Sequence, residues 1–560
     1  MKRFFCGILL TCTGLILLSA SSLHERIYLQ TDKHLYLAGE PVLMKLATTD
    51  QEQIPLVFSK VAYVELVSES VARLQIKVEL TNGTGAGRML LPTDLPTGYY
   101  RLIAYTQFMR NEGVGVFFEK NIAVLNTFQS DYYPAESGKS LDDVNPETSK
   151  PEPETISLQP NKTAYTTREH GELILTGLPE NMHTLSVSVA GKEFVPVTAS
   201  DVSLFGNNLM KKPAAFAGEF LPEYEGHIIT GTMISNETGK PESGKTMLTP
   251  GISFPGEGIR FFSGQKTETG DICFFTSGIS GTNEIATILY NADDKYRIDI
   301  QSPFVSEFAP EQMPSLHVDS TYYGQLLERS VALQVLHYFS DDPSVGSDVS
   351  EPFFKMKPSM SYPLEEYTRF TTMREVFTEF IAGARFRRNG DKQEISVLVK
   401  KGNYFEYGSM PLVLLDGVPI SDHDVIFNYD PLAVEIINIY YGPCMMGGYR
   451  FDGIVELTTH HRLHQDLNLN RSTQIISYEG PQTYHMMDIP DYSDEENRRS
   501  RIPDGRHTLL WNPDVPTDGK TSIRLPFDTS DLTGEFQATV EGITKDGYFI
   551  FSTSFFEVGR

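Results

Sequence analysis

Residues 27–42 read IYLQTDKHLYLAGEPV, and the alternation of apolar and polar side chains in this stretch predicts two short β-strands on either side of a polar turn. The same period of two returns in VAYVELVS at 61–68, in LQIKVEL at 74–80 and in LPTGYYRLIAYTQFMR at 95–110, with Gly, Pro and Asn between the runs. Successive short antiparallel strands over about a hundred residues are typical of a β-sandwich. Residues 23–127 are therefore predicted to form one such domain.

The polar residues of this first domain have a characteristic spacing. The pattern T-D-K-x-x-Y-x-x-G-E-x-V at 31–42, with Gly98-Tyr99-Tyr100-Arg101-Leu102 near the end of the domain, resembles the macroglobulin-type domain of alpha-2-macroglobulins and their bacterial relatives. The resemblance implies an immunoglobulin-like sandwich. Together with the segments that follow, it leads us to expect a mainly β chain of tandem immunoglobulin- or macroglobulin-like β-sandwiches with one α+β plug-like domain.

The plug-like domain is predicted from residues 411–459, which read PLVLLDGVPISDHDVIFNYDPLAVEIINIYYGPCMMGGYRFDGIVELTT. The strand ending at Ile420, the Asp430-Pro431 turn and the strand Gly453-Ile454-Val455 resemble the plug domain of TonB-dependent outer-membrane receptors. A receptor barrel needs several hundred further residues, roughly twenty strands of about ten residues. Because fewer follow residue 460, we expect this domain to serve something other than gated transport.

The same domain has clear local signals. Thr372-Met373-Arg374-Glu375 matches a capping box, and apolar side chains follow it at helical spacing. Asp416-Gly417 stands between two apolar strands and predicts a tight turn, because Gly adopts positive φ without strain. Residues 364–460 are therefore predicted to form one α+β domain that unfolds independently of the sandwiches before it.

The middle of the chain divides by composition. Residues 128–155 are rich in Pro, Glu, Ser and Lys and are predicted to be a linker. Residues 156–222 carry a degraded copy of the first motif and are predicted to be a second, smaller β-sandwich; the copied residues are Tyr165, Glu169, Gly171 and Glu172. Residues 223–317 resemble the carboxypeptidase-regulatory, transthyretin-like sandwich, which presents other modules and has no catalysis of its own.

Three further segments complete the predicted organisation. Residues 318–363 are expected to be a helical connector, since apolar residues recur at helical spacing from Tyr322 to Tyr338. Residues 461–503 are polar and without period, which predicts an exposed connector. Residues 504–560 alternate cleanly and are predicted to be a C-terminal β domain, similar to the macroglobulin-family domain that follows the protease-sensitive segment.

The first residues of the chain and its net charge indicate the compartment of the protein and the partners that it does not bind. Lys2 and Arg3, an apolar run to Leu18 and small residues up to Ser22 have the order of a signal peptide, so residues 1–22 are expected to be removed on export. Lipidation at Cys12 is an alternative that the residues leave open. We expect the periplasm, the outer membrane or the cell surface of a Gram-negative bacterium. A formal net charge of −26 argues against nucleic acid and anionic lipid as partners.

Several sequence motifs that form functional sites in other proteins are not expected to do so in this chain. Residues 239–246 match the phosphate-loop pattern, but the prolines and glycines that follow exclude the helix this loop needs, so we expect a turn. His460, His461 and His464 are expected to be exposed polar residues rather than a zinc site. Cys273 and Cys444 are predicted to be buried thiols, the cysteines left once Cys6 and Cys12 depart with the leader. The sequence lacks the Cys-Gly-Glu-Gln thioester and any lipase-like or metalloprotease motif.

These observations predict a non-enzymatic protein with no catalytic residue, metal or cofactor. The main hypothesis is an exported envelope scaffold that binds other envelope proteins, with outer-membrane association and oligomeric state left open. The alternatives are a protease-interacting, macroglobulin-like inhibitor without a thioester, and an accessory to a TonB-dependent receptor. The candidate interaction or cleavage segment lies in the exposed connector and contains Arg462, Arg498, Arg499 and Arg501.

Overall fold

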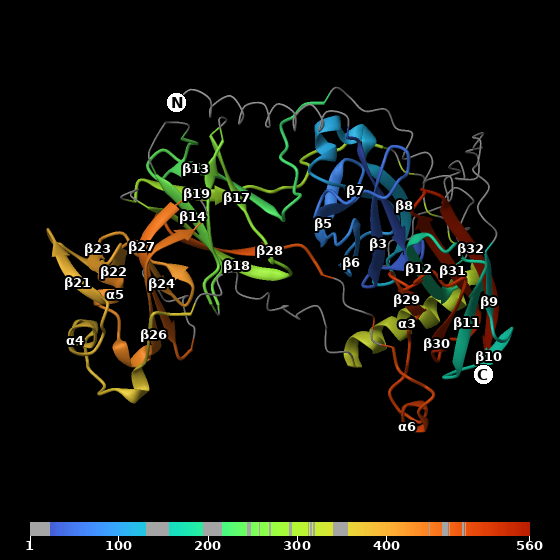
Figure 1. Ribbon diagram of the computed structural model, residues 1–560. Helices are drawn as coiled ribbons and strands as arrows, with labels where there is room; N and C mark the ends of the chain where they lie inside the picture. Colours follow the sequence, from blue (N-terminus) through green and yellow to red (C-terminus); the bar gives the residue numbers. More distant parts are fainter. Residues whose placement is uncertain are drawn as a thin grey trace. The chain divides into compact units, whose positions relative to one another are not determined.

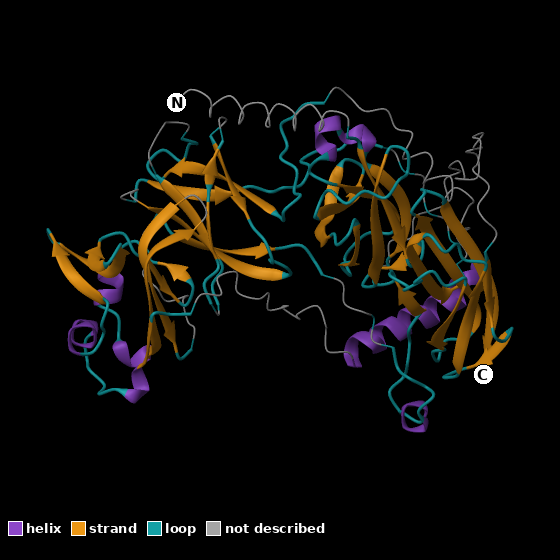
Figure 2. Ribbon diagram, in the orientation of Figure 1, coloured by secondary structure: helices purple, strands orange, loops and turns teal. Residues whose placement is uncertain are grey.

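The computed structural model describes most of the chain after the leader (Figures 1 and 2). The described residues are 23–129, 156–193, 216–242, 248–256, 258–267, 270–290, 294–311, 313, 316, 318, 320–339, 357–446, 449–461, 469, 471–483, 487 and 489–560. The mainly β fold class expected from the sequence is confirmed, since sheets make up the body of every domain. The predicted signal peptide and linker lie outside the described residues.

The chain forms two compact units. Unit 1 contains residues 1–224, 304–346 and 481–560, and unit 2 contains residues 225–303 and 347–480. Each cluster of buried hydrophobic side chains recorded for the described residues lies within one unit. The chain therefore crosses between the units four times, entering unit 2 twice and ending in unit 1.

The first sandwich of unit 1 packs a sheet of order β1-β3-β6 against one of order β2-β8-β7-β4-β5. Its elements are β1 (Glu25–Thr31), β2 (Leu35–Leu37), β3 (Pro41–Asp50), β4 (Val61–Ser68), β5 (Val71–Glu79), β6 (Thr84–Leu90), β7 (Gly98–Tyr105), η1 (Met109–Glu112), η2 (Val114–Val116) and β8 (Phe118–Leu125). The alternating residues of these strands supply the core, because successive side chains point to opposite faces of a sheet.

The polar residues of the motif at 31–42 are buried in this sandwich and bind one another. The Asp32 carboxylate accepts hydrogen bonds from the Tyr36 hydroxyl, at 2.8 Å, and from Lys33 Nζ, at 3.0 Å. Glu40 pairs with Arg329, whose Nη2 lies 2.7 Å from Glu40 Oε2. Burial would raise the pKa of Glu40, but the Arg329 and Lys33 cations lower it to about 2. The motif therefore specifies a closed network of buried charges.

The second sandwich of unit 1 differs from the expectation of separate domains at 156–222 and 504–560. Its strands come from both regions: β9 (Ser157–Pro160), β10 (Ala164–Thr166), β11 (His170–Thr176), β12 (Met182–Gly191), β29 (Thr508–Asn512), β30 (Ser522–Asp528), β31 (Gly534–Thr544) and β32 (Phe549–Gly559). Their sheets have the orders β10-β32-β31-β12-β29 and β30-β11-β9, and Figure 1 shows the red and teal strands interleaved. Neither region has enough strands to cover an apolar face alone, so they share one core.

The helix expected between Tyr322 and Tyr338 is confirmed as α3 (Tyr323–Phe339), preceded by η4 (Ser320–Tyr322). It is more than a connector, because Leu333 is buried against β2 and β8 and Arg329 supplies the cation for Glu40. No helix among the described residues is long and apolar enough to cross a membrane.

The third sandwich, in unit 2, has sheets of order β16-β17-β13-β19 and β15-β14-β18-β28. Its strands are β13 (Ile228–Ser235), β14 (Thr249–Ser253), β15 (Phe261–Ser263), β16 (Gln265–Lys266), β17 (Asp271–Phe275), β18 (Thr282–Tyr290), β19 (Tyr296–Ile300) and β28 (Gln474–Glu479). β28 lies in the segment expected to be an exposed connector, and it pairs with β18 in antiparallel register. That expectation is wrong for residues 474–479, because a short edge strand needs little alternation once a neighbouring strand supplies its hydrogen bonds.

The α+β domain of unit 2 is built on one mixed sheet of order β21-β22-β26-β27-β24-β25, with β20 on β26 and β23 on β22. Its elements are β20 (Met360–Pro363), η6 (Leu364–Glu366), α4 (Met373–Glu379), β21 (Ala384–Asn389), β22 (Lys392–Lys401), β23 (Tyr404–Gly408), β24 (Leu412–Leu415), β25 (Val418–Pro419), α5 (Asp424–Phe427), η7 (Pro431–Ala433), β26 (Val434–Met446) and β27 (Tyr449–Thr459). The resemblance of this domain to a receptor plug stays a prediction.

Two local predictions for this domain are confirmed. Thr372 caps α4 through a complete capping box with Glu375. Asp416 and Gly417 both have positive φ, 49° and 82°, as a two-residue hairpin turn requires. The expectation of independent unfolding is not supported, because one buried cluster joins Phe261 of the third sandwich to residues of β24, β26 and β27.

Candidate functional site

The part of the predicted interaction segment that contains Arg498, Arg499 and Arg501 lies on the second sandwich, between β28 and β29. We name residues 491–504 the arginine loop. Tyr492 anchors its start, because this side chain is only 3% exposed and its hydroxyl donates to Asp504 Oδ2 at 3.0 Å. The Tyr492 amide donates to Asp528 Oδ1 at 3.1 Å, which ties the loop to the end of β30. The loop therefore begins and ends at residues fixed to the sandwich.

Three of the predicted arginines lie together at the outer part of this loop, around the short helix α6 (Glu495–Arg498). Arg498 turns back, and its Nη2 donates to the Tyr492 carbonyl at 2.7 Å. The Arg499 side chain is 77% exposed and pairs with Glu495. Arg501 is exposed and precedes Ile502, itself 55% exposed. Arg462 lies outside the described residues.

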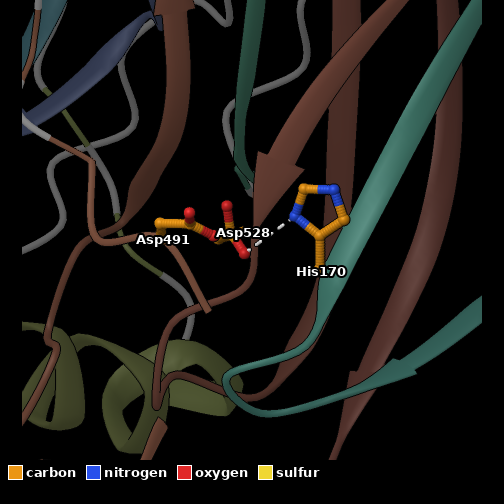
Figure 3. A group of neighbouring side chains, drawn as sticks. All are labelled: His170, Asp491 and Asp528. Atoms are coloured by element: carbon orange, nitrogen blue, oxygen red, sulfur yellow. Dashed lines mark hydrogen bonds and ion pairs between the residues drawn. The ribbon is translucent and has the colours of Figure 1, made fainter. Parts of the chain in front are cut away.

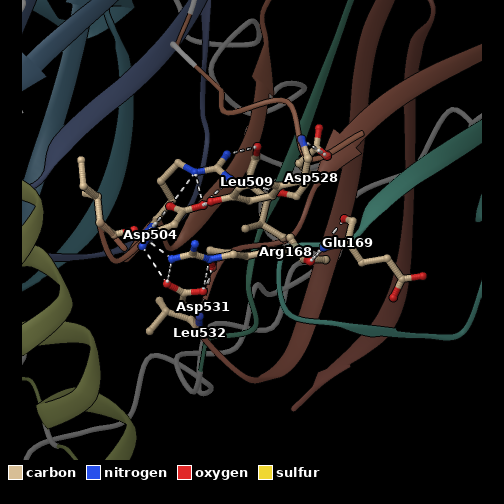
Figure 4. Close-up of polar contacts among 12 residues, drawn as sticks. Arg168, Glu169, Asp504, Leu509, Asp528, Asp531 and Leu532 are labelled. Atoms are coloured by element: carbon tan, nitrogen blue, oxygen red, sulfur yellow. Dashed lines mark hydrogen bonds and ion pairs between the residues drawn. The ribbon is translucent and has the colours of Figure 1, made fainter. Parts of the chain in front are cut away.

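Arg168, in the turn between β10 and β11, binds the backbone of the arginine loop and lies beside Asp504 and Asp531 (Figure 4). Its guanidinium makes a two-point pair with Asp531, with Nε–Oδ1 and Nη2–Oδ2 both at 2.7 Å. Nη2 also donates to the Ile502 carbonyl at 2.8 Å, and Nη1 donates to the Ser500 carbonyl. The hydrogen bond to Asp531 raises the pKa of Arg168, so its charge is permanent.

A second arginine fixes the end of the loop. Arg506 lies beside Asp504, with Nη2–Oδ2 at 2.6 Å and Nε–Oδ1 at 2.8 Å. The Asp504 amide donates to Asp531 Oδ2 at 2.8 Å, and the Asp531 amide donates to the Asp504 carbonyl at 2.9 Å. Burial would raise the pKa of Asp531, but the hydrogen bonds from Arg168 and the Asp504 amide, with the charges of Arg168 and Arg506, lower it. Figure 4 shows these groups as one continuous network.

Beside this network, His170, Asp491 and Asp528 bring three potential metal ligands together (Figure 3). They come from the start of β11, the start of the arginine loop and the end of β30. One ligand atom from each lies within 4.8 Å of the others. His170 Nδ1 is 3.2 Å from Asp528 Oδ1. Hydrogen bonds from Ser493 lower the pKa of Asp491, so its carboxylate is ionised at neutral pH.

Sequence reasoning missed Arg168, His170, Asp528 and Asp531. Their local contexts, TTREHG and FDTSD, resemble ordinary turns and strand ends. Arg168 lies 334 residues before the Ile502 carbonyl that it binds, so no spacing rule links the two. These groups become recognisable only when β11 and β30 pair.

The motifs set aside from the sequence carry no site in the described part of the chain. Gly239 has φ 66° in a turn after β13, and Pro241 bridges back to Ile234, as expected for a sandwich turn. His460 and His461 are exposed at the end of β27, and His464 lies outside the described residues. Cys273 and Cys444 are free and buried, as predicted.

Neither a protein-family model nor a curated protein matches the chain. Among solved structures, the chain is similar to Salmonella alpha-2-macroglobulin reacted with methylamine, with 9% identity, 96% of this chain and 39% of that one covered, and a TM-score of 0.25. It is also similar to Escherichia coli alpha-2-macroglobulin activated by porcine elastase, with 10% identity, 96% and 44% coverage, and a TM-score of 0.25. The chain thus spans about two fifths of these proteins, 39% and 44% of their lengths. They belong to the family that the motif at 31–42 resembles, but at these TM-scores the similarity does not define fold or function.

Proposed function

We propose that the chain is a non-enzymatic binding protein that engages a protease cutting after arginine, through the arginine loop. One observation carries this proposal: Arg499 and Arg501 are exposed, while Arg168 donates to three backbone carbonyls of the loop, those of Arg498, Ser500 and Ile502. Proteases of trypsin specificity bind an arginine side chain in a pocket that contains a carboxylate. Because both ends of the loop are fixed, these exposed arginines stay at its outer part, where a protease can reach them.

The Arg501–Ile502 bond is the peptide bond that best fits such a protease. Both side chains are exposed, so a partner can contact residues on either side of the bond. The Arg499–Ser500 bond is less open, because Arg499 is paired with Glu495 and α6 ends just before it. Proteases bind extended chain, and residues 499–503 lie outside the helical turn at 495–498.

The hydrogen bonds of Tyr492 and Asp504 also bear on whether the chain only binds a protease or rearranges around it after a cut. A cut after Arg501 leaves Tyr492 on one side and Asp504 on the other, and these two residues remain hydrogen-bonded to each other and to the sandwich. We therefore expect a nicked chain that stays folded, rather than one that rearranges. The same anchors favour the second candidate function, an exported envelope scaffold in which residues 491–504 are a plain connector.

Limited proteolysis of the full chain tests the proposal. Trypsin and chymotrypsin are added at low ratio, cleavage sites are mapped by mass spectrometry, and retained protease is measured by gel filtration. We expect trypsin to cut first after Arg501 and to stay associated with the chain. The double variant Arg499→Gln, Arg501→Gln should lose both effects, whereas Arg524→Gln, an exposed arginine on β30, should keep them.

Two results would count against the proposal. Equal cleavage of the double variant and the native chain at other sites would show that the arginine loop is not preferred. Cleavage after Arg501 with the protease released and fully active would leave the scaffold as the function.

A further inference from the structure

We propose that His170, Asp491 and Asp528 form a binding site for a zinc-type divalent cation that fastens the arginine loop to the second sandwich. The three donors are one imidazole nitrogen and two carboxylate oxygens, from three separate segments of the chain. Figure 3 shows the three labelled side chains close to one another, with the Asp528 carboxylate joined to the His170 ring by a dashed line. Nitrogen and carboxylate oxygen are donors that Zn²⁺ accepts, at bond lengths of about 2.0–2.2 Å.

The spacing of the donors suits a tetrahedral ion. Bonds of that length place neighbouring donors about 3.4 Å apart in a tetrahedron. His170 Nδ1 and Asp528 Oδ1 lie 3.2 Å apart, in a hydrogen bond that a bound ion would replace. Asp491 is exposed, its Oδ1 accepts a hydrogen bond from the Ser493 amide at 2.9 Å, and one of its carboxylate oxygens lies within 4.8 Å of the other two donors. Water would complete the fourth position, as in other sites with three protein ligands.

The Asp528 carboxylate is the strongest reason to expect a ligand here. The residue is only 6% exposed, and both hydrogen bonds recorded for its carboxylate within the described chain end on Oδ1, from the Tyr492 amide and His170. Oδ2 accepts neither of these bonds and is not fully buried, so another ligand can reach the carboxylate. Asp491 and Asp528 each bring a carboxylate oxygen into a group of donor atoms within 4.8 Å of one another, and a cation offsets the repulsion between two such charges.

The neighbouring arginines do not supply this charge. Arg168 is committed to Asp531, and Arg506 is committed to Asp504. Two carboxylates at the site therefore match the two positive charges of the ion. Ca²⁺ fits less well, because it prefers six to eight oxygen donors and does not favour imidazole.

The site has a consequence for the loop. Asp491 belongs to the arginine loop, whereas His170 and Asp528 belong to strands of the sandwich. A bound ion would add a bridge next to the Tyr492 anchor, so that the start of the loop opens less often. The effect on protease recognition rests on the proposed function, but ion binding itself does not.

Calorimetric titration of the full, EDTA-treated chain with Zn²⁺ tests the site, with Ca²⁺ and Mg²⁺ as comparisons. We expect one zinc ion at this site, with affinity reduced at least about tenfold in Asp491→Asn and in His170→Ala. The matched control is Asp518→Asn, which removes an exposed carboxylate from a turn of the same sandwich where φ is 45° and Asn is well tolerated. A second control, His460→Ala with His461→Ala, removes exposed histidines elsewhere and should keep the ion.

Thermal melts of each variant show whether it is folded. We expect Asp491→Asn to melt like the native chain, because Asp491 is exposed and its substitution leaves the core intact. Equal zinc affinity in Asp491→Asn and the native chain, or loss of zinc only in the His460 and His461 variant, would overturn the site. Equal affinity for Ca²⁺ would overturn the assigned ion class. If zinc binds here but no protease engages the loop, the site stands and the proposed function falls.

Discussion

At the scale of single residues, Arg168 shows how one side chain organises a distant segment. Its φ of 56° lies in the left-handed region, which costs an ordinary residue about 1–2 kcal/mol. The fork-shaped guanidinium offsets this cost, because it bonds Asp531 at two points and also reaches the Ile502 carbonyl. Lysine has neither the planar fork nor enough donors in that geometry.

We therefore predict that Arg168→Lys loosens the arginine loop while keeping the charge. Each hydrogen bond to a charged group contributes about 1.5–3 kcal/mol, so losing one should raise the rate of tryptic cleavage after Arg501 by at least about tenfold. Timed digestion with mass-spectrometric mapping measures this rate. Arg524→Lys, in the exposed pair with Glu172, is the control. An unchanged rate in Arg168→Lys would mean that other contacts hold the loop.

At the scale of elements, α5 is joined to β22 through side chains that receive backbone hydrogen bonds. The Gln393 amide donates to Asp424 Oδ1 at 2.9 Å, and the Ile395 amide donates to His423 Nδ1 at 3.0 Å. This bond requires Nδ1 to be free of a proton. Burial lowers the pKa of His423 from the usual 6.5 to about 4, in keeping with that role.

The stability of unit 2 should consequently fall as the pH is lowered from 6.5 toward 4. In that window the unfolded chain binds a proton at His423 and the folded chain does not, so acid favours unfolding by up to about 1.4 kcal/mol per pH unit. Urea unfolding at several pH values measures the slope. His423→Asn keeps an acceptor without a titration and should flatten the curve, whereas His460→Asn, at an exposed position, should not. A curve equally steep in His423→Asn would assign the effect to other groups.

At the scale of the whole molecule, the chain is two units with separate cores. Within unit 2, the Asp416-Gly417 turn touches the third sandwich as well as its own domain. The Asp416 carboxylate accepts from the Thr459 amide at 2.7 Å, and a Cβ on Gly417 would lie 3.0 Å from Pro255 Cα. Damage at this turn should therefore reach both domains of unit 2 and leave unit 1 intact.

Gly417→Val provides the test by calorimetry. We expect two thermal transitions, with only that of unit 2 lowered, by several degrees, since strain of about 1–3 kcal/mol shifts Tm by roughly 2–4 °C per kcal/mol in a domain of this size. Gly390→Val is the matched control, because its φ of 62° imposes similar strain while no atom lies within 4 Å of the new Cβ. A smaller shift in the control isolates the contact with the third sandwich. A single transition in which all structure is lost together would disprove the division into two units.

The sequence by itself determined the features that depend on neighbours along the chain. The alternation at 27–42 predicted strands, the Thr372 capping box predicted the start of α4, and Asp416-Gly417 predicted a tight turn. It also placed the four candidate arginines on one segment predicted to be exposed, and the structure shows Arg498, Arg499 and Arg501 exposed there, while Arg462 lies outside the described residues. Each signal acts over a few residues, so it can be recognised before the fold is known.

Only the tertiary structure decided which strands share a sheet. Alternation predicts that β12 and β31 are strands, but it does not predict that they pair. The sequence of β28 alternates too little to predict that this strand pairs with β18. The Arg168 contacts and the His170, Asp491 and Asp528 cluster follow from those pairings. The physical reason is that a strand's hydrogen-bonding groups fit many partners, and the choice among them is made by burying apolar faces from distant parts of the chain in one core.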